Sequence, residues 1–583
     1  MTEAFLNVVQ SLGGRRWIGP DAQSDRLTEA MAQATRLPLA LARLLVARGV
    51  APEDAEGFLR PSLRDLLPDP RSLRDMEQAA ARFVAAVQAG EPVAIFADYD
   101  VDGGASAALL IHWLRAMGRR ATLYIPDRID EGYGPNDAAM AMLARDHRLI
   151  LCVDCGTLSH GPVAAAVGAD VVILDHHLGA ETLPRALAVV NPNRQDEDGT
   201  LAHLCAASVV FLMLVEANRQ LRQQGIGGPD LMAMLDLVAL ATVADVAPLV
   251  GVNRAFVRQG LRVMAGRDRP GLRALADVAR LDRAPAAYHL GFVLGPRINA
   301  GGRVGACDLG ARLLATDDPS EAARLARELD SLNEDRRVLE AAVRDEAMAQ
   351  AEARGLDGPL VWAAGEGWHP GVVGIVAARL AEATHRPAVV IGLDGAVGKG
   401  SARSVPGVDL GACVHRLAEE GLLIKGGGHK AAAGLTVARD ALEPAMDRLG
   451  ELLARQGAGA AGPRDLKIDG LVMPGAVSTD LIEALDQAGP FGAAAPAPRF
   501  ALSRLAVTSW RGMGEQHLSI RLAQPGAGPT IEAVAFNIVG TPLAQALTSG
   551  GAGLFHVAGR LEINSWGGRN TPRLRLDDAA IAM

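Results

Sequence analysis

The stretch Phe96–Ser106, "FADYDVDGGAS", follows the short apolar run "PVAI" and carries three aspartates at alternate positions, Asp98, Asp100 and Asp102. In an extended chain these side chains project from one face, about 7 Å apart. At an effective dielectric constant of about 20, each adjacent pair of like charges at that spacing costs roughly 2 kcal/mol. The stretch therefore requires an opposing charge.

Helical patterns alternate with apolar strands around this stretch, over residues 75–315. The expected strands lie in "EPVAIFADYD", "ATLYIP", "RLILCVDCG", "DVVILDHH" and "ALAVVNPN". Such alternation predicts a parallel sheet with helices on both faces, and ligands bind at the carboxyl ends of its strands. Three further polar clusters follow apolar runs: Asp154, then Asp175 with His176 and His177, then Asp245 in "ATVADVAPL".

The side chains in these clusters are suited to divalent cations. Carboxylates and imidazoles with few thiols favour Mg²⁺ or Mn²⁺ over a structural zinc. Six such ligands are about what two ions some 3.5–4 Å apart require, and such a pair holds a phosphate and activates water. A single aspartate after a strand is usually a turn or N-cap residue, and adjacent surface histidines need no ligand. Because four clusters occur in one α/β region, we favour the metal site.

Composition and length indicate an ordinary globular protein of three or four domains, with 49% hydrophobic and 21% charged residues among 583. No apolar run approaches the roughly 20 residues that span a bilayer, and Met1–Arg16 lacks a signal-peptide pattern. We therefore expect no membrane partner and a cytoplasmic location. Cys152 and Cys155 form a lone C-x-x-C, which we interpret as buried small hydrophobic residues rather than a zinc or redox site.

The remaining chain divides into recognisable segments. Asp318 looks like an N-cap, with Pro319 at the first helical position, Glu321 completing a capping box and Gly355 as a stop, so we expect one long helix or two with a kink near Asn333. Short strands between Gly/Pro turns predict a C-terminal barrel, preceded by the linker "RQGAGAAGPR". The predicted fold class is α/β multidomain, with five parts: an N-terminal helical extension packed against the next domain (1–74), a parallel-sheet domain (75–315), a long connecting helix (316–355), a smaller α/β domain (356–456) and an OB-like β-barrel (464–583).

The polar clusters closely resemble the motifs of the DHH phosphoesterase superfamily and, within it, of the RecJ exonucleases. "DYDVDGGAS" is similar to the family's first motif, "VDCG" to the second, "LDHH" to the third and "TVADVAPL" to the fourth. The first motif has Gly-Ala-Ser where Ala-Thr-Ser is usual, which removes no proposed ligand. The resemblance implies that His177 faces the scissile phosphate and that Asp175 orients a histidine, so these are the expected catalytic residues. It also implies that two divalent metal ions, Mn²⁺ or Mg²⁺, bind Asp98, Asp100, Asp102, Asp154, His176 and Asp245.

The second α/β segment resembles the DHHA1 domain that accompanies this catalytic core, on "PRINAGGRVG", "WHPGVVGIVAARL", "GKGSARSVPG" and "GGGHKAAAG". Gly426–Gly428 offer backbone N–H groups for an anion nest. The match continues more loosely into the barrel, where "PFGAAAPAPRF" has Ala-Ala-Ala in place of a Gly-Asn element that is common in relatives. The implied phosphate-binding residues, one of them in "PDRIDEGYG", are Arg128, Arg297, Asn299, Ser401, Arg403, His429 and Lys430.

The resemblance implies a metal-dependent 5′→3′ exonuclease that degrades single-stranded DNA to 5′-mononucleotides in DNA recombination and repair. Residues Arg499–Leu576 hold eight arginines and three glutamates, a local charge of 8 − 3 = +5, which suits nucleic acid. Trp510, Phe536 and Trp566 are candidates for base stacking or for barrel core.

Two other functions stay open. One is a DHH/DHHA1 phosphodiesterase acting on short oligonucleotides or cyclic dinucleotides, and the other is a non-catalytic replication scaffold. The 120 residues of 464–583 disfavour the first, and the presence of all six implied ligands disfavours the second. Bacterial relatives further imply a single-strand-binding protein and a helicase as partners.

Overall fold

The structure, a computed structural model, forms two compact units. Unit 1 comprises Met1–Leu67, Pro248–Arg258 and Gly462–Met583, and unit 2 comprises Pro68–Ala247 and Gln259–Ala461. Among the described residues, no helix is both long and apolar enough to cross a membrane. The structure describes residues 3–127, 131–132, 134–459, 464–526, 528–549, 553–566 and 569–582.

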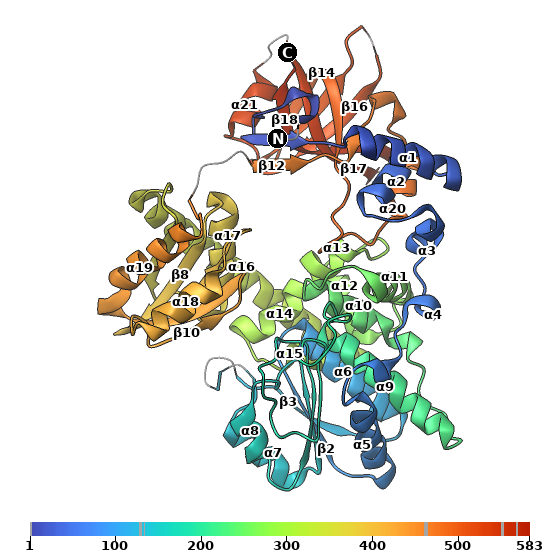
Figure 1. Ribbon diagram of the computed structural model, residues 1–583, viewed down its shortest axis with the longest axis vertical. Helices are drawn as coiled ribbons and strands as arrows, with labels where there is room; N and C mark the ends of the chain where they lie inside the picture. The colour runs from blue at the N-terminus through green and yellow to red at the C-terminus, as the bar shows by residue number, and fades with distance from the viewer. Residues whose placement is uncertain are drawn as a thin grey trace. The chain divides into compact units, whose positions relative to one another are not determined.

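The first sheet of unit 2 is parallel throughout, as the alternation of strands and helices predicts. Its strands run in the order β3-β2-β4-β5-β6. Helices α7 (Asp137–Asp146) and α8 (His160–Ala165) cover one face, and α5 (Met76–Ala89), α6 (Val101–Ala116) and α9 (Ala206–Gln223) cover the other (Figure 1). The strands are β2 (Val93–Ala97), β3 (Ala121–Tyr124), β4 (Leu149–Val153), β5 (Asp170–Leu174) and β6 (Ala188–Val190).

The core between this sheet and α7/α8 contains both residues of the C-x-x-C pair. Cys152 and Cys155 are buried beside Phe96, Met140 and Ile173. Burial raises the pKa of the Cys152 thiol to about 12, so the thiol stays protonated and apolar. This confirms the interpretation of the pair as small hydrophobic residues.

A group of helices follows the sheet in unit 2 and ends in the long connecting helix. Helix α16 (Pro319–Arg354) is continuous over 36 residues, without a break at Asn333, and would span roughly 54 Å. Asp318 caps it, but Glu321 bonds to Thr316 and Arg312 instead of completing a capping box, so that detail was wrong. The preceding elements are α10 (Leu235–Ala244), α11 (Gly251–Ala265), α12 (Pro270–Val278), α13 (Ala287–His289), the π-helix η5 (Leu290–Leu294), α14 (Gly295–Val304) and α15 (Leu309–Ala315). The part of α11 up to Arg258 belongs to unit 1.

The second sheet of unit 2 is mixed, in the order β10-β11-β9-β8-β7. Gly426–Gly428 lie in its edge strand, paired with β11, so the expected anion nest is not what these glycines form. An extended edge strand lacks the alternating αR and αL residues that curl a nest. The elements are β7 (Val361–Glu366), α17 (Pro370–Thr384), β8 (Ala388–Asp394), β9 (Val397–Arg403), α18 (Leu410–Glu419), β10 (Lys425–Gly428), β11 (Ala432–Ala438) and α19 (Leu442–Arg455).

Unit 1 contains the predicted barrel. Five strands pair in the order β14-β15-β16-β18-β17, and a further pairing of β14 with β17 closes the barrel. Its interior is apolar, with Leu502, Ile520 and Leu574 almost completely buried. The barrel elements are β13 (Gly470–Leu471), α20 (Thr479–Asp486), β14 (Phe500–Met513), β15 (His517–Ala523), β16 (Thr530–Ala535), α21 (Pro542–Thr548), β17 (Leu554–Trp566) and β18 (Arg569–Ile581).

Residues 1–67 of the N-terminal extension belong to the same unit as the barrel, so our expectation that they pack against the next domain was wrong. Residues 68–74 belong to unit 2, where η3 (Pro70–Ser72) contacts α5 and α9. β1 (Arg15–Ile18) pairs with β12 (Arg464–Lys467), and the buried Trp17 indole donates to Asp578 at 2.9 Å. Helices α1 (Ala22–Thr35) and α2 (Leu39–Ala47) contribute to one hydrophobic core with Phe500. These long-range contacts leave no periodic signal in the sequence.

Pro248–Arg258, which we expected within the domain of 75–315, also belongs to unit 1. The buried Arg254 holds it there by donating to the carbonyls of Phe58, Ala488 and Gly489. Of the predicted linker, the part at residues 460–463 lies outside the described residues.

The loop "PFGAAAPAPRF" forms a tight turn around its three alanines. Gly492 and Ala495 exchange both backbone hydrogen bonds, at 2.9 and 3.1 Å. Ala494 between them has φ +55°, in the left-handed region that favours glycine. The alanine therefore occupies a strained position in this turn.

Candidate metal centre

The three aspartates of the opening stretch do not lie along an extended strand, so they do not project from one face in the way we expected. β2 ends at Ala97 and α6 begins at Val101, so the chain turns between Asp98 and Asp102. Asp100 is the N-cap of α6, and its Oδ1 accepts from the N–H groups of Asp102 and Gly103, at 2.8 and 3.1 Å. The chain turns here because an aspartate at this position is also a favourable N-cap, and Asp100 caps α6.

Two residues fix this turn against its surroundings. A Cβ on Gly103 would lie 2.4 Å from the backbone oxygen of Asp98, so only glycine fits this close approach. The side-chain Oδ1 of Asn299, in α14, accepts from the N–H of Val101 at 3.0 Å. Asn299 thus supports the aspartate turn, and its expected phosphate contact stays a prediction.

Asp102 is buried at the N-terminus of α9. Its two carboxylate oxygens accept from the N–H groups of Ala206 and Ala207, at 2.7 and 2.8 Å. Burial nevertheless raises the pKa of Asp102, more strongly than nearby His176 lowers it. The helix N-terminus stabilises the carboxylate form there, while burial disfavours any uncompensated charge.

Asp154 and Asp245 bring two further carboxylates to this place. Asp154 follows β4 with φ +60° and is 2% exposed. Burial, and then the charges of Asp102, Asp100 and Asp98, raise its pKa well above the usual range. Asp245 caps the end of α10, and burial followed by the charges of Asp102 and Asp100 raises its pKa to about 8. These shifts follow from the burial of several carboxylates close to one another.

His176 lies in the middle of the carboxylates. Its Nε2 is 3.2 Å from Asp154 Oδ1 and 3.7 Å from Asp102 Oδ2, and its Nδ1 is 3.9 Å from Asp245 Oδ2. The neighbouring His177 points its Nδ1 at Asp175 Oδ1 instead, at 2.8 Å. Burial lowers the pKa of His177, but the hydrogen bond and charge of Asp175 outweigh burial and raise it to about 9.

A buried hydrogen-bond network holds the two histidines, and sequence reasoning missed three of its members. Asp175 accepts from Thr157 through both the backbone N–H, at 3.0 Å, and the hydroxyl, at 2.7 Å. Asn191 donates to Thr157 Oγ1 and to the His177 backbone oxygen, both at 2.8 Å. Asn193 donates to the His176 backbone oxygen at 2.6 Å. The only sequence signal was the Asn-Pro-Asn that follows "AVV" at the end of β6.

Seven side chains thus form three overlapping groups in which the ligand atoms lie within 4.8 Å of one another. Asp154 belongs to two groups and His176 to two groups, so the groups form a single centre. Carboxylate oxygens and imidazole nitrogens without a thiol are the donor set expected for Mn²⁺ or Mg²⁺. The three groups are Asp98/Asp100/Asp154, Asp102/His176/Asp245 and Asp154/His176/His177.

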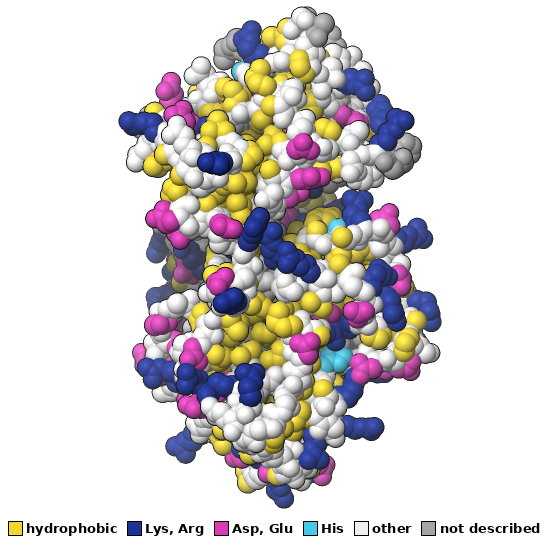
Figure 2. All heavy atoms as spheres, turned by 90° about the vertical axis from the view of Figure 1, so that its right-hand side faces the viewer, with side chains coloured by type: hydrophobic (Ala, Val, Ile, Leu, Met, Phe, Trp, Pro, Cys, Tyr) yellow, Lys and Arg dark blue, Asp and Glu magenta, His cyan; other side chains and the backbone are white. Residues whose placement is uncertain are grey.

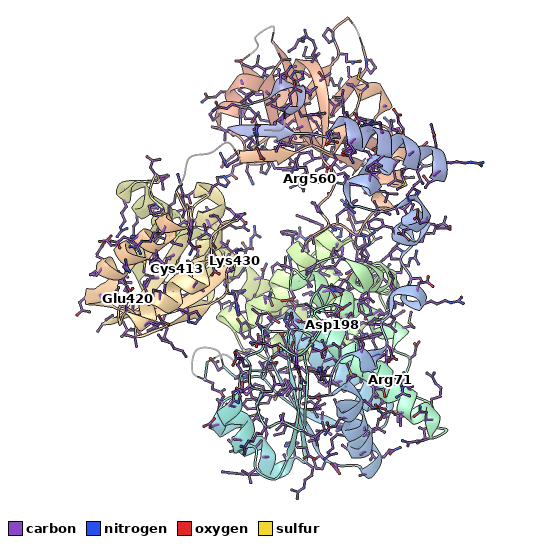
Figure 3. All side chains as sticks on the ribbon, viewed as in Figure 1. Arg71, Asp198, Cys413, Glu420, Lys430 and Arg560 are labelled. Carbon is purple, nitrogen blue, oxygen red and sulfur yellow. The ribbon has the colours of Figure 1, made fainter. Side chains whose placement is uncertain are left out.

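A second set of predicted residues lies beside the N-terminus of α17, on the mixed sheet. Ser401 and Arg403 lie on one face of β9, and a Cβ on Gly374 in α17 would be 3.0 Å from Ser401 Oγ and 3.2 Å from Arg403 Nη2. Lys430, labelled in Figure 3, is exposed with His429 in the turn between β10 and β11. A helix N-terminus with a guanidinium and a hydroxyl is an arrangement that can bind a phosphate.

The other two predicted phosphate contacts are less direct. Arg297 is paired with Asp330 of α16 at 2.8 Å and donates to the Val293 carbonyl. Arg128 lies outside the described residues. Their roles stay predictions.

The barrel carries aromatic side chains outside its core. Trp510 is 50% and Phe536 37% exposed, which answers the question of core or surface for these two rings. The guanidinium of Arg575 lies 5.2 Å from the centroid of the Phe536 ring, and His517 packs edge-on against that ring. The side chain of Trp566 lies outside the described residues.

Three family models match the chain: the DHH family N-terminal domain at residues 92–242, the DHHA1 domain at 357–455 and the RecJ OB domain at 468–578. The single-stranded-DNA-specific exonuclease RecJ of Dickeya dadantii is 38% identical over 521 residues, which are 86% of this chain and 90% of the relative. RecJ of Thermus thermophilus in complex with Mn²⁺ superposes with a TM-score of 0.79 at 30% identity, covering 97% of this chain and 79% of that one. Its complex with Mg²⁺ gives a TM-score of 0.73 at 28% identity, covering 97% and 78%. With all three domains matched and this degree of identity over most of both chains, the chain belongs to the RecJ family.

Proposed function

We propose that the protein is a single-stranded-DNA-specific exonuclease that depends on divalent cations and hydrolyses phosphodiester bonds. The observation that carries the proposal is the convergence of five aspartates and two histidines at the carboxyl ends of β2, β4 and β5 and at the end of α10. Membership of the RecJ family supports the choice of substrate, because curated relatives are named for single-stranded DNA.

Asp98, Asp100, Asp102, Asp154, His176 and Asp245 would hold two ions, Mn²⁺ or Mg²⁺. The shared positions of Asp154 and His176 suit neighbouring ions, since each side chain lies in two of the three groups. When bound, such ions neutralise charge on a phosphate and lower the pKa of water. The carboxylates attract divalent cations because, once buried, their negative charge is not screened by bulk solvent.

His177 would contact the scissile phosphate. Asp175 accepts from its Nδ1 and fixes the ring, which leaves Nε2 on the opposite edge as a donor for a phosphate oxygen. Asp175 is itself held by two bonds from Thr157. Asp175 therefore positions His177 and need not touch the substrate.

Ser401 and Arg403 would bind the 5′-terminal phosphate, with His429, Lys430, Arg297, Asn299 and Arg128 as further contacts. A phosphate held there would present the adjacent bond for cleavage, release 5′-mononucleotides and give 5′→3′ polarity. The polarity rests on the resemblance to RecJ exonucleases, and the α17 N-terminus supports an anion site beside Arg403. The barrel would bind the strand through exposed Trp510 and Phe536, with Arg575 beside the ring.

Digestion of a single strand labelled at its 5′ end, and of the same strand labelled at its 3′ end, tests the proposal. With Mn²⁺ we expect early release of the 5′ label as mononucleotide, and no release with a chelator. Earlier release of the 3′ label would overturn the polarity. Cleavage that ignores the chelator would overturn the metal-dependent mechanism.

The cellular setting is a finer proposal, carried by the family resemblance alone. We infer that the enzyme acts in the cytoplasm in DNA recombination and repair, with a single-strand-binding protein and a helicase as partners. Co-purification of tagged full-length protein from cells, with and without nuclease treatment, tests these partners. Recovery of neither partner, or recovery only through bridging DNA, would contradict the proposal.

A further inference from the structure

Four exposed apolar side chains lie next to candidate site residues in the sequence or on the segment that packs against α10, and we define them as the apolar rim. Apolar side chains are exposed in many places on the face seen in Figure 2, so exposure alone selects no site. The rim residues differ because two of them directly follow residues of the candidate site, namely His177 and Asp245. They are Leu178, Val246, Tyr288 and Phe292, which are 57%, 70%, 58% and 71% exposed.

Val246 is held in a strained backbone conformation at the end of α10. Its N–H bonds to the Val243 carbonyl at 3.2 Å, and the N–H of Ala247 bonds to the Thr242 carbonyl at 3.0 Å. This pair of bonds is a Schellman motif, in which the residue at the position of Val246 is usually glycine. Val246 instead has φ +59°, which is unfavourable for a β-branched residue.

Packing does not account for a valine at this position. A side chain that stays 70% exposed gains little from burial, so glycine would give a more stable helix end. Backbone strain of this kind persists mostly where a side chain has a function. The neighbouring Asp245 is a candidate ligand, so the strained residue directly follows a residue of the candidate metal centre.

Tyr288, in α13, and Phe292, in the π-helix η5 that follows it, extend the rim. Their rings are stacked, with centroids 5.2 Å apart and planes 22° from parallel. A Cβ on Gly291 would lie 3.3 Å from Val243 Cγ1, so this segment packs directly on the last turn of α10. π-Helical turns often occur at functional sites, and exposed stacked rings leave outer faces open to a further ring.

We propose that the apolar rim is a contact surface for nucleobases of the strand whose phosphate lies at the metal centre. Val246 contacts the nucleotide nearest the metal centre, and the Tyr288–Phe292 pair stacks with a base farther along. The inference rests on the proposed function. A single strand fits because its bases are unpaired, and every base presents a flat apolar face.

The test measures equilibrium binding of a fluorescent single strand with Ca²⁺ in place of Mn²⁺, chosen so that the metal centre can be occupied without rapid cleavage, together with thermal unfolding. Val246→Gly should raise the melting temperature by relieving strain and weaken binding about tenfold. Phe292→Ala should weaken binding by a similar factor, about tenfold, with no gain in melting temperature. A strand with abasic sites at its 5′ end should bind wild type and both variants alike, a result that a purely structural role would not produce.

Two matched controls separate the contributions. Ala494→Gly relieves a comparable left-handed residue in unit 1 and should raise the melting temperature without changing affinity. Val338→Ala truncates an exposed valine on α16, which is 63% exposed, and should leave affinity unchanged.

Three results overturn the inference. Wild-type affinity in both rim variants would show that the rim faces something other than the strand, such as a protein partner. An equal loss of affinity on the abasic strand would exclude contact with bases. Failure of the wild type to bind or cut any single strand would instead overturn the proposed function, so the two failures are distinguishable.

Discussion

The two sheets of unit 2 differ in the sign of the charge at their candidate sites and in how deeply the charged side chains are buried. The parallel sheet gathers carboxylates that are buried, so burial and mutual repulsion raise the pKa values of Asp154 and Asp245. The mixed sheet carries Ser401 and Arg403 half-buried, with His429 and Lys430 exposed. A bound cation would offset the mutual repulsion of the buried carboxylates, whereas the side chains on the mixed sheet reach solvent. Under the proposed function, a resident cation would bind at the first sheet, and a phosphate that must enter and leave would bind at the second.

Removing a carboxylate from the buried centre should have the largest effect. Asp154→Asn should reduce cleavage of single-stranded DNA about 1,000-fold, since a divalent ion supplies several kcal/mol of transition-state stabilisation. The same variant should melt at a higher temperature than wild type in EDTA, because it removes a buried charge that faces other aspartates.

Cleavage rates in Mn²⁺ and melting curves in EDTA measure both effects. Asp146→Asn, an exposed aspartate at the end of α7, is the matched control and should change neither. A variant that is unfolded, or one that cleaves normally, would mean that Asp154 is not a ligand of the cation.

The supporting network of the centre should give the next effect. Asn191→Ala removes the hydrogen bonds to Thr157 Oγ1 and to the His177 backbone oxygen, so the backbone that carries His177 is held less firmly. We expect metal affinity and cleavage to fall about 10- to 100-fold, the range for groups that orient ligands. Titration with Mn²⁺ measures the affinity, and recovery of the cleavage rate at high Mn²⁺ would distinguish lost affinity from lost chemistry. Unchanged Mn²⁺ affinity would contradict the role of Asn191.

The contrast between Asp154 and Asn191 shows what the sequence could predict. Asp154 follows an apolar run that the sequence predicts to be a strand. In a parallel sheet, residues that follow the strands lie at the same edge, so the position of Asp154 could be predicted. Asn191 acts through hydrogen bonds to residues 14 and 34 positions away, and no local pattern encodes those partners. For the same reason the resemblance anticipated the candidate ligands but not Thr157 or Asn193.

The fold also has parts that the sequence predicts and parts that it does not. The strands of the parallel sheet and the boundaries of α16 follow from periodicity and capping residues, and they agree with the structure. The pairing of β1 with β12 joins residues more than 440 positions apart, and no local pattern indicates it. The run Gly426–Gly428 suggested an anion nest, yet pairing with β11 makes it a strand despite the low strand propensity of glycine.

A smaller effect is expected at the positive set on the mixed sheet. Arg403→Ala should raise the KM for a 5′-phosphorylated strand about tenfold, because a charge-assisted hydrogen bond to phosphate is lost. The KM for a strand with a 5′-hydroxyl should change little. Lys425→Ala, an exposed lysine at the start of β10, is the control and should leave both values unchanged. An equal change on both strands would show that Arg403 does not read the terminal phosphate.

The smallest expected effect comes from a substitution in α17 where this helix packs against Ser401 and Arg403 of β9. Gly374→Ala would place a methyl group 3.0 Å from Ser401 Oγ and 3.2 Å from Arg403 Nη2, tighter than ordinary contact. Because both atoms end flexible side chains, they can shift by a few tenths of an ångström at modest cost. We expect the KM for the 5′-phosphorylated strand to rise about threefold, less than for the loss of the arginine itself. The melting temperature should stay near that of wild type, because alanine is favoured over glycine inside a helix. A rise in KM equal to that of Arg403→Ala would mean that the side chains of Ser401 and Arg403 cannot shift. The contrast between a rigid metal centre and an adaptable phosphate site would then fail.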